Sequence, residues 1–332
     1  MAFSFNRLLI PAALLGFISS GLTAAEAPPQ SIVFTGMCDA SAAAAIDAER
    51  FVVADDEDNI LRVYSRAGGA PLSEFDLSEF LQVQGRKKAK EADLEAAAQI
   101  DGYTFWITSH GRNSKGKDKP ERQRLFATET RVDGSKVEIA PIGEPYSALL
   151  DDLLSDERLA RYDLKSASQL APKAAGGLNI EGLAATPEGR LLIGFRNPVR
   201  DKKLLVVPLL NPLDIVKGGK AKLGIPIELE LQGQGIRSIE RVGDRYVIIA
   251  GATGEGGEPS RLFEWDGKEQ PKPVAGVTLR GLNPEGVAFH GKDGKGEYFI
   301  LSDDGTRSVG GQDCKDLKEP SLKRFRGWMV KL

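Results

Sequence analysis

Hydrophobic positions in this chain fall in short runs separated by polar turns. Five times, a stretch that opens with polar residues continues through small or apolar residues, turns, and enters a second apolar run. The five stretches read CDASAAAAID, DLEAAAQID, NIEGLAATP, GIRSIERVGD and NPEGVAFHG. Short apolar runs bounded by turn residues are typical of antiparallel strands. Their recurrence along the chain indicates a solenoid, a propeller or an array.

Each repeat is interpreted as a small antiparallel sheet of four strands. The fifth repeat supplies only three expected strands, 286–289, 297–302 and 325–331. The apolar run 31–34, at the other end of the chain, has no partner in the first repeat. Borrowing this run would complete the last sheet and remove the exposed edge of an open ring. We therefore predict an all-β fold, a single β-propeller with five blades, closed by the N-terminal strand.

Two insertions interrupt the repeats. Residues 146–164 place leucines at helical spacing and predict one helix packed on the propeller, although a sixth blade is the alternative. Residues 111–124 form a basic loop. Its cationic residues are Arg112, Lys115, Lys117, Lys119, Arg122 and Arg124. This loop is interpreted either as a solvated surface loop or as a cationic lid over an anionic ligand.

The N-terminus is typical of a secretory signal peptide. Arg7 precedes an apolar stretch, and Ala25-Glu26-Ala27 fits the small-residue cleavage rule. A membrane anchor is the alternative, but the apolar stretch is short for a span, which needs about 20 residues. We expect residues 1–27 to be removed and 28–332 to form the propeller domain. The mature protein would then be periplasmic or secreted, with no membrane span.

The chain contains two cysteines, Cys38 and Cys314. In an exported protein such a pair predicts a disulfide, here between the first repeat and a loop of the last one. Two unrelated buried thiols are the alternative. The net charge of −3 gives no general attraction to nucleic acid, and the basic runs lack interleaved aromatic residues. We expect no nucleic-acid partner, and the oligomeric state stays open.

Propeller geometry brings polar residues of different repeats to one channel mouth, because the first strand of each blade begins where the second one ends. The aligned positions near the start of the first strands are Ser41, Glu95, Glu181, Arg237 and Glu285. The second strands end in Asp55-Asp56, Ser109-His110, Arg196-Asn197, Gly251 and Asp303-Asp304. The sequence thus predicts one mouth rich in carboxylates, with two arginines and one histidine.

Carboxylates gathered this closely need counter-ions. Arg196 and Arg237 can neutralise some of them, and a divalent cation can neutralise others. Oxygen ligands without thiolates favour Ca²⁺ or Mg²⁺ over zinc, and no organic cofactor is expected. The candidate metal ligands are Glu95, Glu181, Glu285 and Asp304. A purely structural alternative is that each glutamate accepts hydrogen bonds from backbone N–H groups of the next blade.

The same mouth supplies candidates for catalysis. Glu95, Glu181 and Glu285 could activate water, and His110 at a strand end could act as a general base, unless it is a solvated loop histidine. The expected anion-binding residues are Arg196, Asn197, Arg237 and Arg112. The GxSxG, P-loop, HExxH and paired CxxC motifs are absent. The leading hypothesis is a metal-assisted hydrolase of a small anionic ester. The alternative is a propeller that binds a ligand or protein without catalysis.

Taken together, DLEAAA, SHGRNSKGK, NIEGLA, SIERVGDRYVIIAG and NPEGVA resemble domain-of-unknown-function family 3616 from about Cys38 to the C-terminus. At greater distance the repeated E-G-(L/V)-A signature is similar to the esterase-like phytase group of propellers. That resemblance implies channel-lining glutamates that hold calcium, at Glu181 and Glu285. Glu95 is followed by Ala96 instead of glycine, and Arg237 departs from the pattern.

Overall fold

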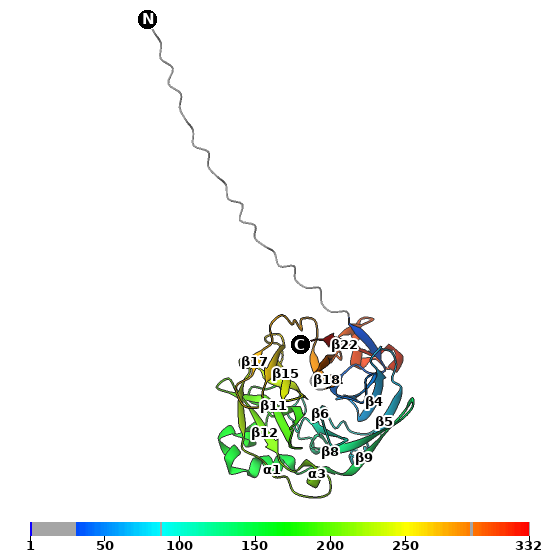
Figure 1. Ribbon diagram of the computed structural model, residues 1–332. Coiled ribbons are helices and arrows are strands. Elements are labelled where there is room, and N and C mark those ends of the chain that lie inside the picture. Colours follow the sequence, from blue (N-terminus) through cyan, green and yellow to red (C-terminus); the bar gives the residue numbers. More distant parts are fainter. Residues whose placement is uncertain (2–30, 87, 293–294, 332) are drawn as a thin grey trace.

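The computed structural model describes residues 1, 31–86, 88–292 and 295–331. Apart from Met1, the predicted signal peptide lies outside the described residues. Five four-stranded antiparallel sheets are arranged around a common axis (Figure 1). The prediction of an all-β, five-bladed propeller is therefore confirmed, and the six-bladed alternative is wrong.

In blades 1 to 4, the strands occur along the chain in order from the innermost strand to the outermost one. Blade 1 contains β2 (Ala40–Ala45), β3 (Arg50–Asp55), β4 (Ile60–Ser65) and β5 (Ser73–Asp76). Blade 2 contains β6 (Leu94–Ile100), β7 (Tyr103–Thr108), β8 (Leu125–Asp133) and β9 (Lys136–Tyr146). Blade 3 contains β10 (Asn179–Ala185), β11 (Leu191–Arg200), β12 (Lys203–Leu209) and β13 (Ile227–Glu230). Blade 4 contains β14 (Gly235–Val242), β15 (Arg245–Gly251), β16 (Arg261–Trp265) and β17 (Lys272–Pro273).

Blade 5 is built from both ends of the chain. It contains β18 (Pro284–Lys292), β19 (Lys295–Ser302), β22 (Arg324–Val330) and, as its outermost strand, β1 (Ile32–Thr35). The strands β1 and β22 pair antiparallel, which confirms closure by the N-terminal strand. A disulfide joins Cys38 to Cys314, with 5.9 Å between their Cα atoms. Its second cysteine follows a small hairpin of β20 (Ser308–Val309) and β21 (Gln312–Asp313).

The hydrophobic core lies between neighbouring blades. The inner strands contact one another in the ring order β2, β6, β10, β14, β18 and back to β2. Between blades 5 and 1, Phe34 of the closing strand is fully buried and stacks on Phe325, with 4.8 Å between ring centroids. Burying a phenylalanine contributes about 1.5–3 kcal/mol. This aromatic contact gives the closing strand a side-chain anchor in addition to its backbone pairing.

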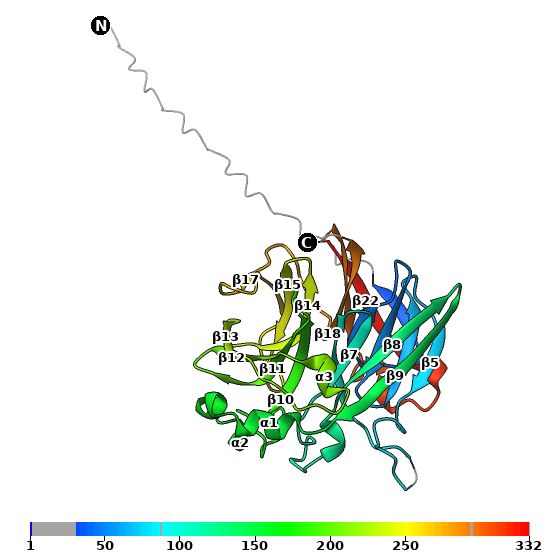
Figure 2. The same ribbon diagram turned by 60° about the horizontal axis from the view of Figure 1, so that its bottom comes forward.

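The helical insertion packs on the propeller as predicted, but it is not one helix. It contains α1 (Leu149–Ser155), a 3₁₀ turn (Glu157–Tyr162) and α2 (Leu164–Ala167), visible at the lower left of Figure 2. The helix is broken because Asp156 is extended and Asp163 has a left-handed backbone, with φ of 51°. The remaining short helix, α3 (Pro212–Ile215), lies within blade 3. Among the described residues, no helix has the length and apolarity needed to span a bilayer.

Candidate functional site at one channel mouth

A β-bulge occurs at the same point in all five inner strands. The pairing register with the second strand shifts by one residue in each blade. The residues left between the shifted pairs are Ser41, Glu95, Glu181, Arg237 and Glu285. A bulge leaves one residue out of the ladder and re-aims its side chain. The five residues that the sequence repeats align with one another therefore occupy the same structural position, the bulge of the inner strand, in all five blades.

Three of these bulge residues, Glu95, Glu181 and Glu285, line a cavity of about 720 Å³. Its carboxylates are Asp39, Asp56, Glu57, Glu91, Asp93, Glu95, Glu181, Glu255, Glu285 and Asp303. Its cationic side chains are Lys119, Arg122, Lys173, Arg196 and Lys315. Ten carboxylates thus face five cations, so the lining carries a negative excess that the sequence had predicted for this mouth.

One half of the mouth is charge-compensated. Glu181 accepts a hydrogen bond from Arg196 Nη1 at 2.7 Å and one from Asn179 Nδ2 at 2.7 Å. Its second oxygen lies 3.2 Å from Arg237 Nε, and Arg237 also forms an ion pair with Glu285. All four charged side chains are nearly fully buried. Arg237 therefore bridges two of the glutamates that the sequence assigned to a metal, while Arg196 holds one of them from the other side.

The opposite half contains carboxylates without such partners. Oxygens of Asp39, Asp55 and Asp56 all lie within 4.8 Å of one another. Glu95 lines the same cavity, is 8% exposed, and has no hydrogen bond or ion pair to any residue that the structure describes. Asp303 also lines the cavity and forms a backbone bridge with Asp39.

Burial and mutual repulsion control the protonation of this half. Burial, with Asp303 beside it, raises the pKa of Asp39 to about 9, and burial with Asp58 nearby raises the pKa of Asp55 to about 8. Burial, followed by repulsion from Asp303, raises the pKa of Asp56 well above its ordinary value. Burial, followed by repulsion from Glu181, does the same for the pKa of Glu95. Burial therefore favours the protonated forms of these carboxyl groups, and a cation among them would favour the charged forms.

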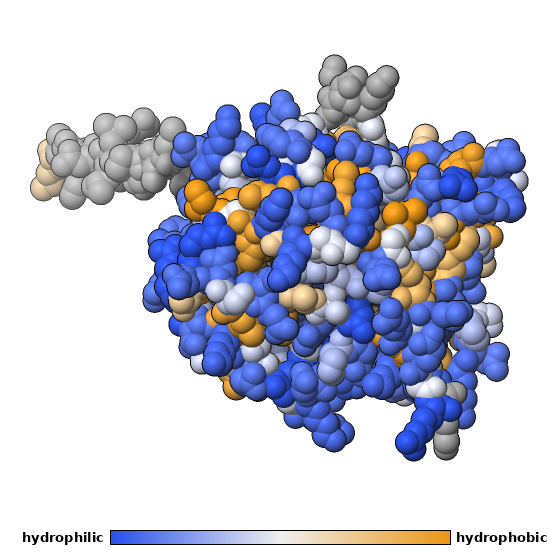
Figure 3. Space-filling view, turned by 90° about the horizontal axis from the view of Figure 1, so that it is seen from below, coloured by the Kyte–Doolittle hydropathy of each residue, from blue (hydrophilic) through white to orange (hydrophobic). Residues whose placement is uncertain are grey.

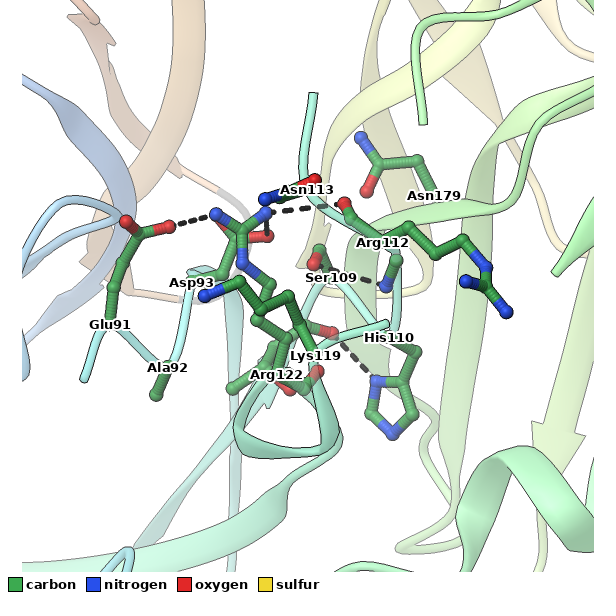
Figure 4. Close-up of polar contacts among 12 residues, drawn as sticks. Glu91, Ala92, Asp93, Ser109, His110, Arg112, Asn113, Lys119, Arg122 and Asn179 are labelled. Atoms are coloured by element: carbon green, nitrogen blue, oxygen red, sulfur yellow. Dashed lines mark hydrogen bonds and ion pairs between the residues drawn. The ribbon is translucent and has the colours of Figure 1, made fainter. Parts of the chain in front are cut away.

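Arg122 is one of several cavity residues that sequence reasoning did not single out. It ends the 3₁₀ turn Pro120–Arg122 in the basic loop. Its guanidinium lies between two carboxylates (Figure 4), donating to Asp93 Oδ2 at 2.8 Å and pairing with Glu91. The loop contains six cationic residues, and nothing in its sequence distinguishes Arg122 from the other five. The prediction that this loop borders the mouth is nevertheless supported, because Lys119 and Arg122 both line the cavity.

His110 does not belong to the cavity lining, so its predicted role as a general base has no support from the structure. Its ring is 2% exposed, and Nδ1 donates to the carbonyl of Thr108 at 2.8 Å (Figure 4). Nε2 is buried without a hydrogen-bond partner among the described residues. Burial lowers the pKa of His110 to about 4, so the imidazole is neutral at physiological pH. The residue is a packed part of the strand end.

Three further predicted site residues lie beside the cavity and support it. Arg112 points away from the Arg122 cluster (Figure 4) and donates to the Ser168 carbonyl at 2.8 Å, tying the basic loop to the helical insertion. Asn197 donates to the carbonyls of residues 172 and 174, which belong to a loop at the cavity rim. Asp304 is bound through both oxygens by Arg326 at 2.6 Å. None of these three residues lines the cavity, and each is engaged by other parts of the protein, so the structure does not support the predicted ligand or metal contacts.

A family model described as "Protein of unknown function (DUF3616)" matches residues 39–136 and 128–280. The chain belongs to this family. The sequence motifs therefore identified the family correctly. The more distant resemblance to esterase-like phytases stays a prediction. No curated protein matches the chain.

Several solved structures show a distant similarity to the chain. Glutaminyl cyclase from Myxococcus xanthus is 13% identical, with a TM-score of 0.42 over 92% of this chain and 100% of that one. The PQQ-bound aldose sugar dehydrogenase from Streptomyces coelicolor is 14% identical, with a TM-score of 0.42 over 92% and 100%. The exo-β-1,3-galactanase from Phanerochaete chrysosporium is 7% identical, with a TM-score of 0.46 over 92% and 64%. At these values none of them assigns an activity to this chain.

Proposed function

We propose that the channel mouth binds a divalent cation together with a small anionic ester, either a phosphate ester or a lactone, and hydrolyses the ester. The division of charge across one cavity carries this proposal. Carboxylates without counter-ions lie on blades 1, 2 and 5, whereas Arg196 lies on blade 3. A cation and an anion bound together complement such a lining better than either does alone.

The lining provides a role for each part of the reaction. A divalent cation neutralises the carboxylates and polarises the bound ester and a water molecule. Arg122 and Lys119 reach the cavity from the basic loop and supply positive charge for an anionic group. Glu95 lies in the lining without a partner and is the carboxylate best placed to take a proton from water.

The disulfide supports an exported location. Disulfides persist in oxidising compartments and are rare in the cytosol. The bond between Cys38 and Cys314 is formed, and both residues are fully buried. A periplasmic or secreted protein, released from the predicted signal peptide, fits this observation.

A binding propeller without catalysis is the second candidate. It is favoured by the fact that Arg196 and Arg237 are already engaged by Glu181, so the most buried guanidinium groups are occupied within the protein. A scaffold acting through the outer faces has less support. The face in Figure 3 is mostly hydrophilic, with hydrophobic residues distributed among polar ones.

The test is a hydrolysis screen of phosphate monoesters and lactones with the purified protein, in CaCl₂ or MgCl₂ and in EDTA. We expect turnover that EDTA abolishes and that Glu95→Gln lowers by about 10²–10⁴-fold. The matched control is Glu255→Gln, an exposed carboxylate of the same cavity, which should retain activity. A compound that raises the melting temperature and is never turned over would replace the hydrolase with the binding propeller.

A further inference from the structure

We propose that Asp39, Asp55 and Asp56 of blade 1 form the binding site for a hard divalent cation, with Glu95 of blade 2 facing it. This site differs from the glutamate ring of Glu95, Glu181 and Glu285 that the sequence suggested as metal ligands, because only Glu95 is common to both. The role of the cation in hydrolysis rests on the proposed function, but the binding site itself stands on the geometry of blade 1 and can be tested separately.

The spacing of the aspartate oxygens fits one ion. Two oxygens that bind the same Ca²⁺ at about 2.3–2.6 Å lie at most about 5 Å apart. One oxygen from each of Asp39, Asp55 and Asp56 lies within 4.8 Å of the other two. Three carboxylates can therefore reach a common cation with small side-chain adjustments, leaving the other coordination positions for water or ligand oxygens.

Two carboxylates beside this cavity lack a partner among the described residues. Glu95 is more than nine-tenths buried, lines the cavity, and has no hydrogen bond or ion pair to any described residue. Oδ1 of Asp56 is buried and likewise lacks a hydrogen-bond partner within the described part of the chain. Buried carboxylate oxygens are normally hydrogen-bonded, since leaving them unpaired costs free energy. A cation held by the three aspartates would give Oδ1 of Asp56 a partner and would place positive charge in the cavity that Glu95 lines.

The fold holds Asp39 in place for this role. Asp39 directly follows the disulfide-bonded Cys38, whose carbonyl accepts a hydrogen bond from the Asp304 backbone at 2.9 Å. Its carboxylate lies against Gly305, where a Cβ would come within 1.6 Å of Asp39 Oδ1. The close approach requires glycine at this position. Ring closure and the aspartate cluster are thus built by the same segment.

The glutamate ring is a poorer cation site because it already contains its counter-ion. Arg237 pairs with both Glu181 and Glu285, and it would repel a second cation between them. No histidine or cysteine is found among the residues lining the cavity. Carboxylate and water ligands suit Ca²⁺, Mg²⁺ or Mn²⁺ rather than Zn²⁺ or Cu²⁺.

Isothermal titration of the purified protein with CaCl₂ tests the site. We expect saturable binding that Asp56→Asn weakens by about tenfold or more, because the cluster loses one charged ligand. Glu95→Gln should weaken it in the same direction, and provides a second variant if Asp56→Asn does not fold. Glu255→Gln removes one charge from the far side of the same cavity and should change the affinity by less than about threefold. Absence of binding of Ca²⁺, Mg²⁺ and Mn²⁺ to the wild type, or equal losses in Asp56→Asn and Glu255→Gln, would overturn the site.

Failure of the cation site and failure of the proposed hydrolase would give different experimental results. Calcium binding that depends on Asp56, in a protein that hydrolyses no ester, would support the site and remove the hydrolase. Ester hydrolysis by a protein that binds none of Ca²⁺, Mg²⁺ and Mn²⁺ would overturn the site and the role of the cation, and would leave hydrolysis at the mouth to the protein's own side chains.

Discussion

Replacing Arg237 with methionine should destabilise the protein strongly, because this arginine is the shared counter-ion of two buried glutamates. The exposed fractions of the side chains are 7% for Arg237, 4% for Glu181 and 9% for Glu285. Methionine keeps most of the volume and removes the charge. Glu181 retains Arg196 as a partner at 2.7 Å, so Glu285 is the carboxylate that loses its cation.

The expected magnitude follows from that difference. Removing one partner of a buried ion pair costs about 3–5 kcal/mol, since a charge is left uncompensated. Because Glu181 stays paired, we expect a value near the lower end, about 3 kcal/mol. Adding Glu285→Gln to the Arg237→Met variant should recover more than half of this loss, since the amide leaves no uncompensated charge. The exposed pair of Arg131 and Glu129 provides the control, and Arg131→Met should cost less than about 1 kcal/mol.

The assay is equilibrium unfolding in urea, followed by tryptophan fluorescence at neutral pH. The reasoning would be refuted if Arg237→Met and Arg131→Met gave the same free energy of unfolding. It would also be refuted if the added Glu285→Gln substitution made the Arg237→Met variant less stable. Either result would mean that Arg237 does not serve as the counter-ion of the glutamates.

Three other predictions follow from the fold and its site. Replacing Cys38 and Cys314 with serine should lower the free energy of unfolding by up to about 5 kcal/mol, because the disulfide spans 276 residues; a loss under about 1 kcal/mol in urea unfolding would contradict this. Gly305→Ala should weaken calcium binding in calorimetry by displacing the Asp39 carboxylate, and unchanged affinity would count against a role for Asp39. The folded-state pKa of His110 is lowered to about 4, so between pH 6.5 and 4 the unfolded chain binds a proton that the folded protein does not. The contribution of His110 to stability, up to about 3 kcal/mol, is therefore lost as pH falls through that range, and melting curves at pH 7 and pH 4.5 should show a smaller loss for His110→Asn than for the wild type.

The repeat pattern was sufficient to predict the ring. Short apolar runs and turn residues predicted the strands closely, since the expected strands 297–302 and 325–331 match the observed β19 and β22 to within two residues at each end. The missing partner of the run 31–34 predicted closure by β1. The helical insertion was predicted less well, because its leucine spacing does not reveal the left-handed backbone of Asp163 that breaks the helix.

The site was predicted at the level of the mouth but not of individual contacts. Alignment of the repeats located Glu95, Glu181 and Glu285, since a bulge shared by all inner strands keeps them equivalent. It could not tell which glutamates are neutralised within the protein, because that depends on the reach of Arg237 across two blades. It also could not distinguish neighbouring residues at a strand end. Asp303 lines the cavity whereas Asp304 turns to Arg326, a choice set by three-dimensional packing.

The most direct test of the account is an anomalous difference map from crystals of the purified protein soaked in MnCl₂. Mn²⁺ takes the same oxygen ligands as Ca²⁺ and Mg²⁺ and can be located by its anomalous scattering. The account predicts a single strong peak among the carboxylates of Asp39, Asp55 and Asp56, on the side of the cavity that Glu95 faces. A peak between Glu181 and Glu285, or a cavity without any peak, would contradict it.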